Sequence, residues 1–233
     1  MARLLLTTEG QTEQAFAVRV LQPHLAPLGV YVVKPRCAAL CREHGVVHRG
    51  GVVNYQPLRE DIQNWIRQDR DENARFSTMI DLYGLPSDFP GVDQARRAID
   101  PYQRVAILEQ AFADDINSQR FIPYIQLHEF ESLLLADQTK LCDYYGLERL
   151  EELTPLKEVL AAKKNPELID DGEGTAPSKR IADCIPEYAM AKSTAGPIVA
   201  EAIGLMALRQ ACRHFNEWIE RLEALGLGSR EQP

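Results

Sequence analysis

Apolar positions along the first 136 residues follow two alternating patterns. Short runs rich in Leu, β-branched and aromatic residues predict strands over 3–8, 30–34, 75–82 and 121–127. Between these runs, apolar residues recur at helical spacing over 12–25, 57–68, 93–117 and from 129 to about 136. Strands that alternate with helices in this way predict an α/β domain with a mostly parallel sheet and helices on both faces.

Proline positions and the loss of the strand pattern refine this picture. Pro57 suits the first turn of its helix, and Pro101 is expected to divide the stretch 93–117 in two. After about residue 136 no strand pattern follows, and helical spacing dominates up to Leu225. We therefore predict an α/β core over 1–136 and a helical C-terminal extension, 137–233, that packs on the core.

Composition and charge narrow the class of protein. The chain has 233 residues, 45% of them hydrophobic and 26% charged, as in ordinary globular proteins, and no apolar run is long enough to cross a membrane. Its five cysteines are an odd number for a disulfide framework, so free thiols in the cytoplasm are expected. The net charge of -8 disfavours coating of nucleic acid by bulk electrostatics, but it does not exclude an enzyme that acts on nucleic acid.

Acidic residues follow three of the predicted strands. Glu9 comes after the first strand, Asp81 ends the third, and Glu129 and Glu131 follow the fourth. Because the carboxyl ends of parallel strands share one edge of a sheet, these carboxylates are expected to lie together. Clustered carboxylates repel one another unless a cation is present, and their oxygens suit Mg²⁺ or Mn²⁺. Two further candidate metal ligands are Glu13 and Asp88.

Each acid also has a structural explanation. The segment Thr8 to Gln11 fits a T-x-x-Q capping box, and Glu129 and Glu131 suit the first turn of a helix, where the macrodipole favours acids. Asp88 fits a turn. Asp81 is harder to explain structurally, because it ends a strongly apolar strand where an unpaired carboxylate is costly.

Several segments resemble TOPRIM-type proteins. The run Glu9-Gly10-Gln11-Thr12-Glu13 resembles the opening E-G-x-[ST]-[DE] element of TOPRIM domains. Three further segments resemble a family of TOPRIM-like proteins related to the overcoming-lysogenisation-defect nucleases: Arg49 to Tyr55, Met79 to Pro86 with Asp88 to Gly91, and His128 to Leu134. The resemblance implies a TOPRIM/Rossmann-like fold and a nuclease, often encoded beside an ABC/SMC-like ATPase in anti-phage defence.

The same resemblance implies roles for the acids. Glu9 matches the first TOPRIM glutamate, a metal ligand or general acid/base, and Asp81 matches the first aspartate of the D-x-D element. Tyr83 stands in place of the second aspartate, and Asp88 is the nearest acid that could substitute for it, so one or two metal ions remain open. Glu131 is a further catalytic and metal residue, with Glu129 and Glu13 as additional ligands.

Basic residues are candidates for substrate contact. Lys179 and Arg180 could contact the scissile phosphate, Lys179 as a catalytic point charge, although they also suit an exposed helix start after Pro177. Arg49 lies in a locally basic loop and is a second candidate for nucleic-acid contact. His128 is either a packed histidine or a proton shuttle beside Glu129.

Two cysteines and two histidines in and before the same basic loop could suggest a zinc site. Cys37, Cys41, His44 and His48 have acceptable pair spacings, but only two residues separate the pairs, which is too few for a structural zinc site. No Walker A or G-x-G-x-x-G pattern is present, so any ATP dependence must come from a partner.

The sequence thus predicts a metal-dependent nuclease acting on DNA or RNA, with Glu9, Asp81 and Glu131 holding Mg²⁺ or Mn²⁺. The chief alternative is a non-catalytic partner of an ABC-type ATPase that uses the TOPRIM fold for docking. A phosphatase or phosphoacceptor domain is a third hypothesis. The absence of a nucleophilic Asp paired with a second acid directly after the first strand counts against it. Self-association into a homo-oligomer is left open.

Overall fold

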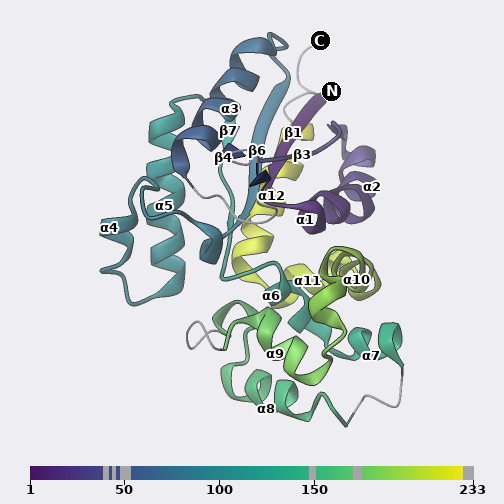
Figure 1. The fold of residues 1–233 in the computed structure, drawn as a ribbon. Helices are drawn as coiled ribbons and strands as arrows, with labels where there is room; N and C mark the ends of the chain where they lie inside the picture. Colours follow the sequence, from purple (N-terminus) through teal and green to yellow (C-terminus); the bar gives the residue numbers. More distant parts are fainter. Residues whose placement is uncertain (39–41, 44–45, 48–53, 147–150, 170–174, 228–233) are drawn as a thin grey trace.

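The computed structural model describes residues 1–38, 42–43, 46–47, 54–146, 151–169 and 175–227. As predicted, they form an α/β fold with a mostly parallel six-stranded sheet, helices on both faces and a helical C-terminal part (Figure 1). The strands of the sheet are β1 (Ala2–Thr8), β2 (Val30–Val32), β3 (Arg36–Cys37), β6 (Ala74–Asp81), β7 (Phe121–Ile122) and β8 (Ile125–Gln126). A separate antiparallel pair consists of β4 (Arg42–Glu43) and β5 (Val46–Val47).

The helices divide between the α/β part and the C-terminal part. The first group contains α1 (Gln11–Phe16), α2 (Gln22–Leu25), α3 (Tyr55–Gln68), α4 (Val92–Ala95) and α5 (Pro101–Ile116). The second group contains α6 (Glu131–Leu134), α7 (Thr139–Tyr145), α8 (Thr154–Lys163), α9 (Pro177–Cys184), α10 (Tyr188–Ile203), α11 (Leu205–Ala211) and α12 (Arg213–Leu227). Among the described residues, no helix is both long and apolar enough to cross a membrane.

Strands β1 and β6 form the centre of the sheet. The strand order is β2-β1-β6-β7, with β3 beside the end of β1 and β8 beside the end of β6, and every pairing is parallel. The register of β1 on β6 runs from Arg3 opposite Ala74 to Thr8 opposite Met79. The carboxyl ends of β1 and β6 are therefore direct neighbours.

Both faces of the sheet are covered, which explains why the strands are apolar on both sides. Leu4 and Leu6 point into a core shared with α1 and α12, whereas Leu5, between them, points into a core shared with α3 and α5. This alternation follows from the period of two of a β-strand. Trp218 of α12 reaches the sheet directly, because its indole N–H donates to Ser77 Oγ of β6 at 3.0 Å.

The predicted strand 121–127 is divided in two. Pro123 has no N–H to donate, and the side chain of Thr78 replaces the backbone ladder at this point. Its Oγ1 donates to the carbonyl of Tyr124 at 2.9 Å and accepts from the N–H of the same residue at 3.0 Å. As a result β7 pairs with the middle of β6, and β8 pairs with its end.

Two predicted helical stretches are each divided in the structure. The division of 93–117 at Pro101 is confirmed: α5 begins at this proline, and the Asp100 carboxylate accepts from the N–H of Tyr102 at 3.1 Å. The helical spacing predicted after about residue 136 is likewise divided, since α7 and α8 are separate helices. Helix α7 ends at Tyr145, directly before Gly146, whose φ of 125° only glycine adopts readily.

The C-terminal helices share a hydrophobic core with the sheet. One cluster of buried side chains contains Leu4, Leu6 and Phe16 of the α/β part together with Phe215 and Trp218 of α12. In Figure 1, α12 runs alongside the strands, whereas α6 to α11 gather beyond their carboxyl ends. The division at residue 136 remains a prediction, and the core is continuous across it.

Candidate functional site

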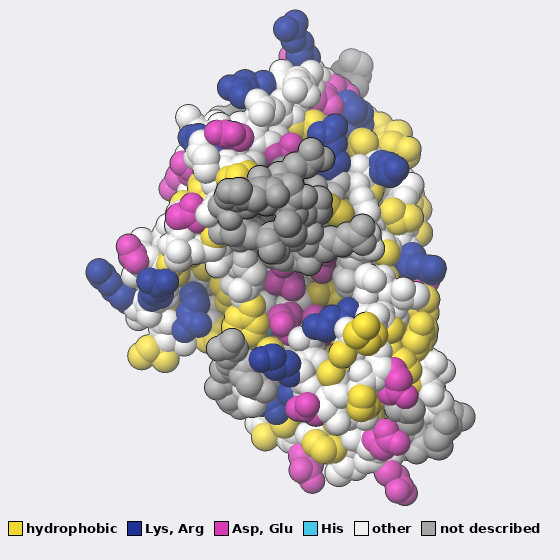
Figure 2. Space-filling view, in the orientation of Figure 1, with side chains coloured by type: hydrophobic (Ala, Val, Ile, Leu, Met, Phe, Trp, Pro, Cys, Tyr) yellow, Lys and Arg dark blue, Asp and Glu magenta, His cyan; other side chains and the backbone are white. Residues whose placement is uncertain are grey.

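The acids that follow the strands lie at the carboxyl edge of the sheet. Glu9 directly follows β1, Asp81 is the last residue of β6, and Glu131 begins α6 shortly after β8. In Figure 2, acidic side chains gather in the middle of the face shown, between the α/β part above and the C-terminal helices below. This position corresponds to the level at which β1 and β6 end in Figure 1.

Glu9 and Asp81 are directly connected. Oε2 of Glu9 accepts a hydrogen bond from the backbone N–H of Asp81 at 2.8 Å, which ties the loop after β1 to the end of β6. Burial raises the pKa of Glu9, this hydrogen bond opposes the rise, and the charges of Glu129 and Glu131 add to it. A proton or a cation is therefore favoured beside Glu9.

Asp81 is the most perturbed of the acids. Its Oδ1 is buried and accepts no hydrogen bond from any residue that the structure describes. Its pKa is raised well above the usual range, first by burial and then by the negative charges of four other acids: Glu9, Glu13, Glu131 and Glu129. An unpaired buried carboxylate oxygen is costly, so this atom needs a proton or a cation as partner.

Because Gly84 has no side chain, the carboxylate of Glu9 can lie against its backbone. Gly84 ends the short helical turn Leu82–Gly84 after β6, and a Cβ at this position would lie 2.7 Å from both carboxylate oxygens of Glu9. The turn is fixed by the N–H of Tyr83, which donates to the carbonyl of His128 at 3.1 Å. The absence of a side chain at Gly84 thus allows β6 and the loop after β1 to approach each other.

Glu131 is held by the C-terminal helices. It is buried, and its Oε1 accepts a hydrogen bond from the hydroxyl of Tyr188 at 3.0 Å and lies 3.8 Å from Nζ of Lys192, both on α10. Burial raises the pKa of Glu131 to about 7, although Lys192 acts against the rise. The carboxylate therefore lies between the sheet edge and α10.

Glu129 and Glu13 are anchored to backbone N–H groups nearby. Oε2 of Glu129 accepts from the N–H of Ser178 at 2.9 Å, which brings the first turn of α9 to the acids. Glu13 is buried in α1 and accepts from the N–H of Gly10 at 2.8 Å. Burial raises the pKa of Glu13 to about 7, and the charge of Glu9 contributes to the rise.

The arrangement fits a divalent cation in the type of its donors. Carboxylate oxygens are the ligands that Mg²⁺ and Mn²⁺ prefer, and Oδ1 of Asp81 has no other partner among the described residues. Within the described part of the chain, however, no three His, Cys, Asp or Glu side chains converge on one ion position. Glu9, Glu129 and Glu131 each accept a hydrogen bond from the protein, so they must turn from these donors to hold an ion.

One protein-family model matches most of the chain. The family described as a domain of unknown function, DUF4276, matches residues 8–223. The chain belongs to the DUF4276 family. The matched range contains all of the acids described above. No curated protein and no solved structure matches the chain significantly.

Asp88 does not join the other acids in this DUF4276 chain. Its two carboxylate oxygens lie 3.1 and 3.3 Å from the N–H of Tyr55 and accept a hydrogen bond from it at the start of α3. Asp88 is exposed, and it is not among the charges that raise the pKa of Asp81. The expectation that it replaces the missing second aspartate is therefore not supported by its position, which is that of a helix cap.

The capping box at the start of α1 also differs from the one expected. The T-x-x-Q pattern assigns the cap to Thr8 and Gln11, but the N–H of Gly10 is satisfied by Glu13. The hydroxyl of Thr8 instead donates to the carbonyl of Gly10 at 3.1 Å. Glu13 therefore has both a capping role and a place beside Glu9.

The structure describes two of the three basic residues expected to contact the substrate. Lys179 and Arg180 lie in the first turn of α9, next to Ser178, so α9 brings them near Glu129. Arg180 donates from Nε to the carbonyl of Thr175 at 2.7 Å. Arg49 lies outside the described residues.

The zinc candidates cannot be compared as a set, because Cys41, His44 and His48 lie outside the described residues. Cys37 is an exposed free thiol at the end of β3. His128 is buried and adopts a left-handed φ of 61°, unusual for a residue with a Cβ. Its ring centre lies 5.7 Å from that of Tyr83, so it packs beside the turn that follows Asp81.

Sequence reasoning missed the residues that surround the acids. Tyr188 and Lys192 contact Glu131 from a helix more than fifty positions later in the chain, and no local pattern indicates this contact. Gly84 had a weak signal, because it stands in the segment Met79 to Pro86 that carries the resemblance. Only the packing of α10 against the sheet edge identifies the other two.

Proposed function

We propose that this chain is a metal-dependent nuclease that hydrolyses phosphodiester bonds of DNA or RNA. The observation that carries the proposal is the placement of Glu9 and Asp81 at the ends of two adjacent parallel strands, with the Asp81 Oδ1 atom unpartnered among the described residues. Such a cluster favours a divalent cation, and ligands of open α/β sheets bind at this edge. The resemblance to TOPRIM-type nucleases points to the same chemistry.

The residues of this chain have distinct parts in the proposal. Glu9, Asp81 and Glu131 hold Mg²⁺ or Mn²⁺, with Glu13 and Glu129 beside them. A bound ion would supply positive charge at the phosphate and acidify a water molecule. In the proposal, Lys192, which lies 3.8 Å from Glu131, and Lys179, in the first turn of α9, contact the phosphate.

The proposed setting is the cytoplasm, in association with an ABC/SMC-like ATPase in anti-phage defence. The four cysteines that the structure describes are free thiols, as is expected in a reducing compartment. The partnership rests on the resemblance alone. The ATPase would bind the nucleotide, because this sequence has no Walker A or G-x-G-x-x-G pattern.

Metal binding by isothermal calorimetry on metal-free protein tests the proposal. The wild type is expected to bind Mn²⁺ more tightly at pH 8 than at pH 6, because burial raises the pKa of Glu131 and of Glu13 to about 7 and ions bind the deprotonated carboxylates. Asp81→Asn is expected to lose this binding together with metal-dependent cleavage of DNA or RNA. Asp88→Asn is the matched control and should retain both, because Asp88 caps α3.

A non-catalytic partner of an ATPase remains the second candidate. The position of Asp88 favours it, since Asp88 is the nearest acid that could substitute for the second D-x-D aspartate and it caps a helix instead. On this hypothesis Asp81→Asn leaves ATPase binding unchanged, and the folded wild type binds no divalent ion. That absence of binding would contradict the nuclease proposal.

A further inference from the structure

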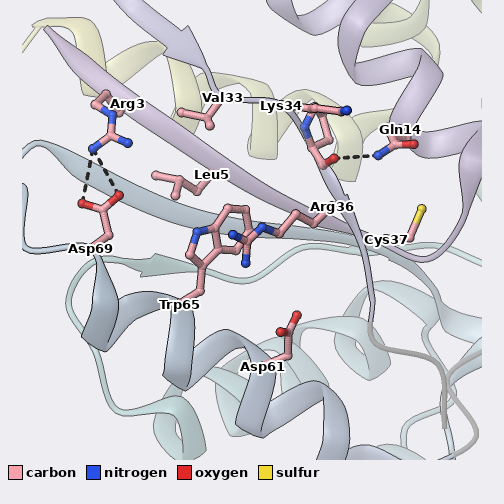
Figure 3. A pocket seen from close by; sticks show the side chains of 11 residues that line it. Arg3, Leu5, Gln14, Val33, Lys34, Arg36, Cys37, Asp61, Trp65 and Asp69 are labelled. Atoms are coloured by element: carbon pink, nitrogen blue, oxygen red, sulfur yellow. Dashed lines mark hydrogen bonds and ion pairs between the residues drawn. The ribbon is translucent and has the colours of Figure 1, made fainter. Parts of the chain in front are cut away.

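A second candidate binding region, a cavity with cationic side chains in its lining, lies at the β2–β3 edge of the sheet. A cavity of about 710 Å³ opens there between the strands and α3, and we name it the β3 groove (Figure 3). It is lined by Arg3, Leu5, Gln14, Val33, Lys34, Pro35, Arg36, Cys37, Asp61, Trp65 and Asp69. One end is fixed by Gln14, whose side-chain amide donates to the carbonyl of Pro35 at 2.6 Å.

Arg36 forms a flat cationic surface in this groove. Its guanidinium carbon lies 4.0 Å from the centre of the Trp65 ring, and Figure 3 shows the side chain extended across that ring. Trp65 is only 6% exposed, whereas Arg36 is exposed. The indole thus holds one face of the guanidinium by a cation–π interaction and leaves the other face to solvent.

Lys34 adds a second exposed cation on the same wall. Neither Lys34 nor Arg36 makes an ion pair or a side-chain hydrogen bond with a residue that the structure describes. Of the two acids in the lining, Asp69 is already paired with Arg3 at 3.1 Å. Asp61 is then the only lining acid whose charge is not matched by such a pair within the described residues. In a chain of net charge -8, this wall is a local basic site.

The groove lies beside the strand that leads to the acidic site. In the parallel pairing of β1 with β3, Arg36 lies opposite Thr7 and Cys37 lies opposite Thr8. The N–H of Ala38 then donates to the carbonyl of Thr8 at 2.7 Å. Glu9 is the next residue of β1's chain, so the basic wall lies alongside the strand that delivers the first acid.

We propose that the β3 groove binds a single-stranded segment of the nucleic-acid substrate, an inference that rests on the proposed nuclease function. Lys34 and the N–H edge of Arg36 contact phosphates, and an unpaired base stacks on the open face of the Arg36 guanidinium. A duplex does not offer its base faces for stacking. The small number of cations also fits a short strand better than the broad contact that a duplex requires.

Binding of short fluorescein-labelled oligodeoxythymidine and oligouridine in EDTA tests this inference, because no hydrolysis is needed. The double variant Lys34→Ala/Arg36→Ala is expected to bind about tenfold more weakly or worse. It should also lower the slope of log affinity against log salt by about 1.4, the value for two lost phosphate contacts on a single strand. Arg36→Lys keeps the positive charge but loses the planar guanidinium group. It should therefore keep the salt slope of the wild type and bind the oligonucleotides more weakly.

The control is Arg67→Ala/Arg97→Ala, which removes the same charge at two exposed positions outside the groove. It should bind as the wild type does. Equal affinity and slope for the groove variant and this control would overturn the inference, as would a wild type that binds neither oligonucleotide. Binding that depends on the groove in a protein without cleavage activity would refute the nuclease alone, and cleavage unaffected by the groove variant would refute the groove alone.

Discussion

At the scale of single residues, the acidic site depends on how closely two loops approach. Glu9 reaches over the end of β6 to accept from the N–H of Asp81, and this contact has room only because residue 84 is a glycine. A Cβ at Gly84 would come within 3.0 Å of the carboxyl carbon of Glu9 as well as 2.7 Å of its oxygens. The position of the Glu9 carboxylate is therefore set by a residue that carries no functional group.

Substituting this glycine tests that dependence. Gly84→Ala is expected to displace the Glu9 side chain and to weaken Mn²⁺ binding by about 10-fold or more, the usual effect of disturbing the support of a ligand. The free energy of unfolding should change by less than about 1 kcal/mol, because the displaced group is the end of a flexible, half-buried side chain. Calorimetry and urea denaturation measure the two effects, with Ser87→Ala in the same loop as control. Unchanged Mn²⁺ affinity in Gly84→Ala would show that Glu9 is no ligand.

At the scale of elements, α12 depends on a carboxylate from far away in the chain. Glu167 is fully buried, and it accepts hydrogen bonds at 2.9 Å from the N–H groups of His214 and Phe215 in the first turn of α12. It also accepts from the hydroxyl of Tyr102 on α5 at 2.9 Å. Its negative charge lies at the positive end of the helix macrodipole, so Glu167 caps α12 and ties it to α5.

Removing this cap should loosen the layer that covers one face of the sheet. Glu167→Ala leaves two buried N–H groups of α12 without a partner and is expected to lower the free energy of unfolding by about 2–4 kcal/mol. Glu217→Ala, which removes only an exposed pair with Arg213, should cost less than about 0.5 kcal/mol. Urea denaturation of both variants measures the difference. Equal stabilities would mean that the cap contributes nothing to α12.

At the scale of the whole molecule, the C-terminal helices serve both the core and the site. Helix α12 covers the sheet face that Leu4 and Leu6 present, and α9 and α10 contact Glu129 and Glu131. The acids thus lie between the α/β part and the C-terminal helices. Stability and site geometry are therefore expected to be lost together when the second part is removed.

A fragment of residues 1–136 should show this coupling. Without Phe215 and Trp218 one face of its sheet is exposed to water, so we expect no cooperative unfolding transition and no tight Mn²⁺ binding. A chain of residues 1–227, which keeps every described helix, is the control and should unfold cooperatively. Far-UV circular dichroism during heating distinguishes the two. A cooperative transition of 1–136 would show that the α/β part folds independently.

The pattern of apolar residues was sufficient to predict the α/β class, because strands buried on both faces and amphipathic helices differ in period and length. It also predicted that Glu9, Asp81 and Glu131 follow strands that end at one edge. It did not predict the division of 121–127, where the side chain of Thr78 bonds to Tyr124 in place of the ladder. Nor did it distinguish Asp88 as a cap, since turns and metal sites use the same residue type.

The sequence by itself determined the alternation of strands and helices in the α/β part and the acids at the strand ends, because both depend on residues close together in the chain. The tertiary structure decided which groups surround these acids. Tyr188, Lys192 and the N–H of Ser178 reach the site only because α9 and α10 pack beyond the strand ends. The raised pKa values have the same origin, since burial and repulsion act between side chains that are distant in sequence and adjacent in space.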